Sequence, residues 1–110
     1  MENSILLSIK KLVGRYGEYD AVFDQDLIIH INTVLSMLTQ IGIGPENGFS
    51  ISDDSSTWYD FIGNDPRLES VKSYVYIKVS LMFDPPNNSA LIESMNKIAT
   101  ELEWRLNITQ

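Results

Sequence analysis

The stretch that decides the fold is FDQDLIIHINTVLSMLTQI, residues 23–41. Its apolar residues recur with gaps of 4, 4, 3, 4 and 3, the spacing of one face of an α-helix. Asp20 precedes the run at the position of an N-cap, and Gly42 follows it at the position of a helix stop. Further apolar residues widen the face, so we expect this helix to be central. The seam consists of Phe23, Leu27, Ile31, Val34, Leu38 and Ile41.

The same periodicity predicts helices on both sides of this stretch. A first helix follows Asn3–Ser4 and stops at Gly14, and a short helix over residues 58–62 has Thr57 and Asp60 as a capping box. A third long helix opens at Asp65–Pro66 and closes at residues 84–86, and a last one starts near residues 88–89. The apolar stripes expected in the core are Ile5, Ile9, Leu12 and Val13 in the first helix, Leu68, Val71, Val75, Val79 and Met82 in the third, and Leu91, Met95, Ile98, Leu102 and Leu106 in the last.

Residues 42–57 form the one long irregular stretch. Phe49–Ser52 alternates apolar and polar residues after an Asn47–Gly48 turn, the pattern of a short strand or hairpin that pairs only at an edge. The predicted fold class is therefore all-α: a small bundle of three to four main helices plus a short one, with one long loop that can carry a short β-element. We expect residues 1–110 to form a single domain.

Composition excludes several kinds of protein. The chain has 110 residues, no cysteine and one histidine. Without cysteine it has no disulfide, no thiolate nucleophile and no iron–sulfur cluster. No apolar run approaches the ~20 residues of a membrane span, and we expect no signal peptide.

The net charge of −7 is unevenly placed. Residues 16–66 contain nine Asp or Glu and no Lys or Arg, whereas residues 1–15 are basic and residues 67–110 are balanced. An acidic stretch repels phosphate, so we do not expect it to grip nucleic acid. It is either a solvated face, a surface for a basic partner, or the lining of a passage for a polyanion.

No catalytic, metal-binding or cofactor-binding constellation stands out. The glycines of residues 42–48 have the wrong spacing for a phosphate loop, and no Lys–Ser/Thr pair follows them. Asp53 and Asp54 lack the glycine and glutamate of an EF-hand loop. His30 lies beside the helical seam, where a lone histidine is usually a packed side chain rather than a ligand. We therefore expect no cofactor and no enzymatic activity.

The two tryptophans have different expected roles. Trp58, near Phe61, is expected to lie in the core beneath the long loop. Trp104 lies off the apolar stripe of the last helix, beside Arg105, and Glu101 is placed to pair with Arg105 at i, i+4. Trp and Arg are enriched among the residues that dominate binding energy, so Trp104 is a candidate interface anchor.

Four segments resemble those of the small phage and prophage head–tail connector proteins, and in order and spacing they span roughly residues 20–107. They are TWYDF (57–61), VKSYVYIK (71–78), FDPP (83–86) and ELEWRL (101–106).

The resemblance implies a structural virion protein without catalytic residues, located in the virion neck and present in the host cytoplasm during assembly. It would form a homo-oligomeric ring, about twelvefold, beneath the portal protein. Such a ring extends the channel for double-stranded DNA, which passes without specific binding, and it docks the next neck or tail-completion protein. It serves head completion, DNA retention, and genome packaging and ejection, and involves no membrane.

Beside the resemblance, the residues suggest where partners bind. We expect the C-terminal segment and the long loop to face other subunits, the portal or the next ring. The candidate interface residues are Trp104, Arg105, Leu106, Asn107, Phe49, Ile51, Asp53 and Asp54. The alternative function is an acidic, soluble regulatory or adaptor protein that binds a basic partner.

Overall fold

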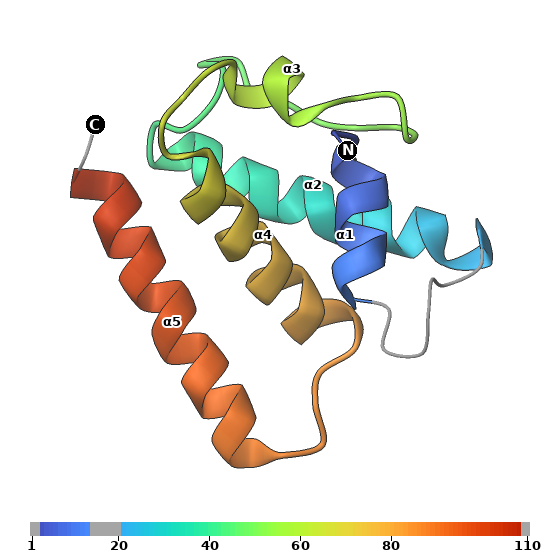
Figure 1. Cartoon of the computed structure of the whole chain (residues 1–110), viewed down its shortest axis with the longest axis vertical. Coiled ribbons are helices and arrows are strands. Elements are labelled where there is room, and N and C mark those ends of the chain that lie inside the picture. Colours follow the sequence, from blue (N-terminus) through green and yellow to red (C-terminus); the bar gives the residue numbers. More distant parts are fainter. Residues whose placement is uncertain (1–2, 14–20, 109–110) are drawn as a thin grey trace.

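The computed structural model describes residues 3–13 and 21–108, which form five α-helices and one short 3₁₀ helix (Figure 1). No strand occurs in this part of the chain, so the predicted all-α fold class is confirmed. In chain order the elements are α1 (Ile5–Val13), η1 (Ala21–Phe23), α2 (Asp24–Gln40), α3 (Trp58–Ile62), α4 (Leu68–Phe83) and α5 (Ser89–Ile108).

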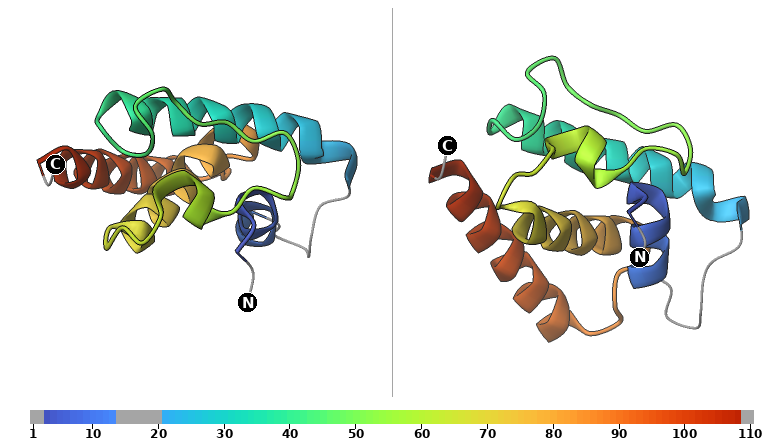
Figure 2. Two further views of the ribbon diagram at one scale, coloured as in Figure 1. Left: turned by 90° about the horizontal axis from the view of Figure 1, so that it is seen from above. Right: turned by 45° about the horizontal axis from the view of Figure 1, so that its top comes forward.

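The helix at the centre of the fold is α4. It packs against α1, α2 and α5, whereas α2 packs against α1, α4 and η1 (Figures 1 and 2). The expectation that α2 would be central is therefore only partly right. A helix that is apolar on most of its faces is suited to the interior of a bundle, and α4 has that composition. Its buried apolar residues are Val71, Tyr74, Val75, Ile77 and Val79.

The seam of α2 is buried as predicted, except at its two ends. Phe23 lies in η1 and is 39% exposed, and Ile41 lies just beyond the helix and is partly buried. The predicted cap at Asp20 and the predicted stop at Gly14 lie outside the described residues. The seam residues without exposed surface are Leu27, Ile31, Val34 and Leu38.

The first helix is capped by Ser4, whose Oγ accepts a hydrogen bond from the backbone N–H of Leu7 at 3.2 Å. Leu12 is 51% exposed, so its predicted place in the core was wrong. Lys10 is buried instead, because its ammonium group forms an ion pair with Asp24 at 3.0 Å and so reaches the start of α2. The stripe residues that are buried as predicted are Ile5, Ile9 and Val13.

The loop between α2 and α3 contains no strand, so the predicted short strand over residues 49–52 is wrong. The side chain of Asn32 takes the place of a pairing strand. Its Nδ2 donates to the carbonyl of Ile51 at 3.0 Å, and its Oδ1 accepts from the Ile51 N–H at 2.7 Å. Phe49 packs on Phe61 with ring centroids 5.3 Å apart. The side-chain amide of Asn32 therefore provides hydrogen-bond partners for the backbone N–H and carbonyl of Ile51, which in a sheet would come from a neighbouring strand.

The short helix α3 has the predicted capping box. The backbone N–H of Asp60 donates to Thr57 Oγ1 at 3.1 Å, and the Thr57 N–H donates to Asp60 Oδ2 at 3.0 Å. Trp58 and Phe61 are buried, which confirms their expected place in the core. The indole N–H of Trp58 lies 3.3 Å from Ser8 Oγ and joins α3 to α1.

The third long helix begins two residues later than predicted, at Leu68. Asp65 is used in the preceding turn, where its carboxylate accepts the backbone N–H of Arg67 at 2.8 Å and binds the guanidinium at 2.7 and 2.9 Å. These hydrogen bonds from Arg67, chiefly those of its side chain, lower the pKa of Asp65. The helix ends at Phe83, where the following proline pair excludes further turns, as predicted.

Replacing Asn32 with Ala should lower the free energy of unfolding by about 1–3 kcal/mol, because the backbone N–H and carbonyl of Ile51 then both lose their hydrogen-bond partner in a largely buried setting. Urea denaturation followed by circular dichroism measures the change. Ser36→Ala, an exposed position on the same helix, is the matched control and should change stability by less than about 0.5 kcal/mol. Equal effects of the two variants would show that the Asn32 bridge contributes nothing.

Gly44 and Gly48 offer a second matched pair. Both have positive φ, +86° and +91°, so alanine at either position costs about 1–2 kcal/mol in backbone strain. A Cβ at Gly44 would in addition overlap the ring of Phe61, whereas a Cβ at Gly48 meets nothing within 4 Å. Gly44→Ala should therefore be less stable than Gly48→Ala by about 1–3 kcal/mol in the same urea measurement. Equal losses would mean that the Phe61 ring moves aside freely.

Candidate interaction surface

The outermost helix of the fold is α5, which packs mainly against α4 (Figure 1). Leu91 and Ile98, which were predicted to lie in its buried stripe, are 49% and 48% exposed, so this part of the prediction was wrong. The helix is turned so that a small residue, Ala99, faces α4 and is buried in place of Ile98. The residues that α5 directs toward the core are Met95, Ala99, Leu102 and Leu106.

One hydrogen bond holds the C-terminal half of α5 against α4. The hydroxyl of Tyr74, a side chain only 1% exposed, donates to Glu103 Oε2 at 2.8 Å. Burial, and then the hydrogen bond to the Glu103 carboxylate, raise the pKa of Tyr74 well above its usual range. The phenol therefore stays protonated and keeps donating throughout the neutral range. This contact agrees with the orientation of α5 that its core-facing residues also require.

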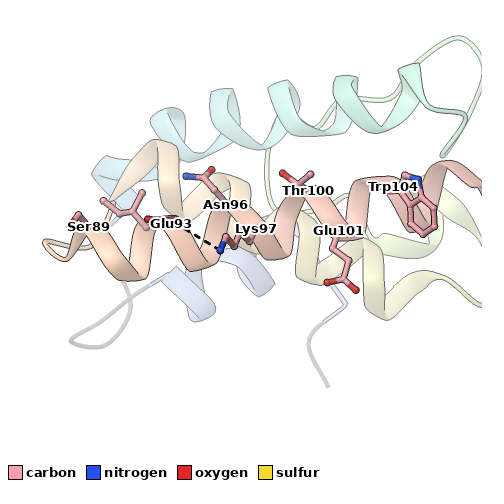
Figure 3. Close-up of a pocket in the computed structure, with 8 residues that line it drawn as sticks. Ser89, Glu93, Asn96, Lys97, Thr100, Glu101 and Trp104 are labelled. Atoms are coloured by element: carbon pink, nitrogen blue, oxygen red, sulfur yellow. Dashed lines mark ion pairs between the residues drawn. The ribbon is translucent and has the colours of Figure 1, made fainter.

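The outer face of α5 carries Trp104, which is 62% exposed as predicted. Arg105 forms the predicted ion pair with Glu101 at 2.7 Å, and Lys97 pairs with Glu93 at 4.0 Å. Both pairs are exposed, so each contributes little to stability. A shallow, mostly apolar groove of about 700 Å³ runs along this face, as Figure 3 shows. Its lining residues are Ser89, Ile92, Glu93, Asn96, Lys97, Thr100, Glu101 and Trp104.

The structure divides the predicted interface residues of the C-terminal segment into two sets. Trp104, Arg105 and Asn107 are exposed on α5. Leu106 is 2% exposed and belongs to the hydrophobic core, so its predicted role as a partner-facing side chain is not supported by its position. The reason is helical geometry, since Leu106 lies on the same face as Ala99 and Leu102.

The predicted interface residues of the loop between α2 and α3 also divide into buried and exposed ones. Ile51 is 4% exposed and Phe49 is half-buried against Phe61, so Ile51 is a core residue rather than a contact surface. Asp53 and Asp54 are exposed. Hydrogen bonds from the Ser55 hydroxyl and backbone N–H lower the pKa of Asp53, so this carboxylate is charged at neutral pH. The exposed part of the loop is therefore acidic.

The acidic character continues around the loop and α3. Between residues 21 and 65 there is no Lys or Arg, and within the described structure only Asp24 and Asp65 of this stretch pair with a basic residue. The uncompensated carboxylates of the loop and α3 are Glu46, Asp53, Asp54 and Asp60, all of which are exposed.

A second hollow lies at the beginning of α2. It has a volume of about 400 Å³ and is lined by Phe23, Asp26, His30, Phe83 and Asp84. His30 is half-buried, with its ring centroid 6.2 Å from that of Phe83, which agrees with the expected packed histidine. Among the residues that the structure describes, no group of three or more His, Cys, Asp or Glu could hold a metal ion.

The burial of Tyr74 and its hydrogen bond to Glu103 make the free energy of unfolding depend on pH in the alkaline range. Because the pKa of Tyr74 is raised in the folded state, its contribution is complete below about pH 10, the usual tyrosine value. Above that pH the unfolded chain loses the proton first, so the free energy of unfolding should fall as pH rises. Tyr74→Phe should lower stability by about 1 kcal/mol at pH 7 and flatten the decline between pH 9 and 11.

Urea titrations at several pH values test this dependence. Tyr59→Phe removes a phenol that is 64% exposed and should leave the alkaline decline as steep as in the unchanged chain. An equally steep fall of the free energy of unfolding in the Tyr74→Phe variant would contradict the attribution of that fall to Tyr74.

Comparison with known proteins agrees with the resemblance noted in the sequence. The family model described as phage connector protein matches residues 5–110, from the first residue of α1 to the end of the chain. Searches of curated proteins and of solved structures give no match. No helix of the described residues is long and apolar enough to cross a membrane. Because the family match spans nearly the whole sequence, the chain belongs to the phage connector protein family, the head–tail connectors of phages.

Proposed function

We propose that this connector is a structural subunit of the virion neck that forms a closed ring, about twelvefold, below the portal protein. The ring extends the DNA channel, joins the filled head to the next neck or tail-completion protein, and takes part in DNA retention and ejection. The role needs no cofactor and no enzymatic reaction. Membership of the connector family supports this reading over that of an acidic regulatory protein.

The observation that carries the proposed ring is the position of α5. This helix has 20 residues, packs mainly on α4, and leaves Trp104 in the open. An exposed aromatic face on a helix is a typical protein-binding surface. The subunit is also flattened, with extents of 35 × 33 × 23 Å, a shape that allows copies to stand side by side.

The acidic loop supports the proposed passage of DNA. Glu46, Asp53 and Asp54 are exposed and have no ion-pair partner among the described residues. Binding of DNA depends on cationic side chains that replace its counterions, and a carboxylate surface repels the phosphates instead. A channel lined by this loop would let the duplex slide without being held.

Cryo-electron microscopy of the parent particle tests the proposal. We expect a ring of this chain directly below the portal, with the loop that carries Glu46, Asp53 and Asp54 facing the channel. Absence of the chain from the neck would overturn the proposed function. A ring with the loop turned outward would overturn only the proposed lining of the channel.

A further inference from the structure

The outer face of α5 differs in charge from the chain as a whole. The chain has a net charge of −7, so two copies of it repel each other at a distance. The groove along α5 is locally neutral, because two carboxylates and two cations alternate along it and its C-terminal edge at every fourth residue (Figure 3). In chain order these residues are Glu93, Lys97, Glu101 and Arg105. This face is therefore one through which two acidic copies can approach closely.

The alternating charges complement themselves when a second helix runs in the opposite direction. If α5 of a second copy lies antiparallel on the groove, Glu93 faces Arg105 of that copy, and Lys97 faces its Glu101. The two-fold symmetry of such a pair repeats both contacts, so all the charges are matched. A parallel pair in register would oppose like charges, and a parallel pair staggered by one turn would leave one charge on each helix unmatched. The charge pattern thus favours the antiparallel arrangement.

These four charged groups can accept new partners at little cost. Lys97 pairs within its own helix with Glu93 at 4.0 Å, and Arg105 pairs with Glu101 at 2.7 Å. The four side chains are between 59% and 78% exposed, so the pairs within the helix contribute little to stability. A second helix would turn two isolated surface pairs per copy into a network that is partly shielded from water.

The two ends of the groove also fit each other when one helix is reversed. Ile92 lies at one end and Trp104, 62% exposed, at the other, about 18 Å away along the helix axis. In the antiparallel pair each Trp104 covers the Ile92 end of the other copy, and Asn96 lies opposite Thr100. This register differs from that of the charges by about 3 Å, which long charged side chains can span. The pair would thus remove both indoles from water.

We propose that two copies of the unassembled chain pair through α5, antiparallel and related by a two-fold axis. The occupant of the groove is thus a second copy of this chain. A ring about a single rotation axis contains no such two-fold axis, so the pair is a state of the chain outside the ring. While the pair lasts it covers Trp104, and it must open before α5 can contact a neck partner. The inference goes beyond the proposed neck function and concerns the chain before assembly.

Analytical ultracentrifugation of the purified chain tests the pairing. We expect an equilibrium between monomer and dimer at concentrations up to about 1 mM, because a contact through one helix face is small. Trp104→Ala should weaken dimerisation at least tenfold, the effect of losing one anchor residue. Tyr59→Ala, at another exposed aromatic residue, is the matched control and should leave it unchanged. A chain that stays monomeric, or a dimer that Trp104→Ala does not weaken while circular dichroism shows an intact fold, would overturn the proposal.

Inverting the charges tests the orientation of the two helices. The inverted chain carries Glu93→Lys, Lys97→Glu, Glu101→Lys and Arg105→Glu, which keep the net charge and the opposite signs within each helical pair. Two inverted chains still match in the antiparallel arrangement, whereas an inverted and an unchanged chain oppose like charges at every contact. Native mass spectrometry of the mixture should therefore show the two homodimers and at least tenfold fewer mixed dimers than random pairing gives. A preference for mixed dimers would indicate a parallel pair in register and refute the proposal.

Cysteine cross-linking distinguishes the antiparallel pair from a staggered parallel one, and the chain has no native cysteine to interfere. Ser89 and Asn107 are exposed near the two ends of α5, about 27 Å apart along its axis. In the antiparallel pair Ser89→Cys lies opposite Asn107→Cys of the other copy, so mixing the two variants under oxidising conditions should link them. Neither variant should link to itself, because its two thiols lie far beyond disulfide reach. Self-linking of Ser89→Cys without the mixed product would contradict the antiparallel arrangement.

Failure of this inference can be distinguished from failure of the proposed function. A chain that is monomeric in solution but forms a ring in the neck refutes the pair and keeps the neck function. A purified chain that pairs as described, together with its absence from the neck, keeps the pair and refutes the neck function.

Discussion

The arrangement of this fold depends on the burial of α4. Each of the long helices α2 and α5, and the shorter α1, packs against it, and its apolar residues point in several directions around the helix axis. An apolar surface as extensive as that of α4 is unfavourable in water unless other elements cover it. Covering α4 on three sides places α2 and α1 at one side of the subunit and α5 at the other (Figure 2).

This constraint also explains why the subunit is left with an interaction surface. Since α5 is held mainly by α4, one side of it is buried and the rest is open to other molecules. Its core-facing residues, among them Ala99 and Leu106, pack inside, the bond between Tyr74 and Glu103 agrees with this orientation, and Trp104 stays outside. The same helix thus completes the core of the subunit and presents the surface by which a connector can meet its neighbours.

Much of the local structure could be predicted from the residues themselves. The capping box of Thr57 and Asp60, the cap at Ser4 and the proline-terminated end of α4 follow from contacts within a few residues of the chain, and the seam of α2 follows from its apolar periodicity. The strand over residues 49–52 was predicted wrongly, because its alternation is real but its pairing partner is Asn32, an amide nineteen residues earlier. Of the candidate interface residues, Trp104, Arg105, Asn107, Asp53 and Asp54 are exposed, whereas Leu106 and Ile51 are core residues.

The sequence by itself determined the all-α class, the positions of the helices, the uneven charge and the likeness to connectors, because these depend on periodicity, capping and residue type along the chain. Only the tertiary structure decided which helix is central, which way α5 is turned, and which of the candidate interface residues are buried. These depend on how side chains from distant segments fill the space around α4. The apolar stripe 91–95–98–102 alone does not reveal whether α4 will pack against Ile98 or against Ala99 of α5.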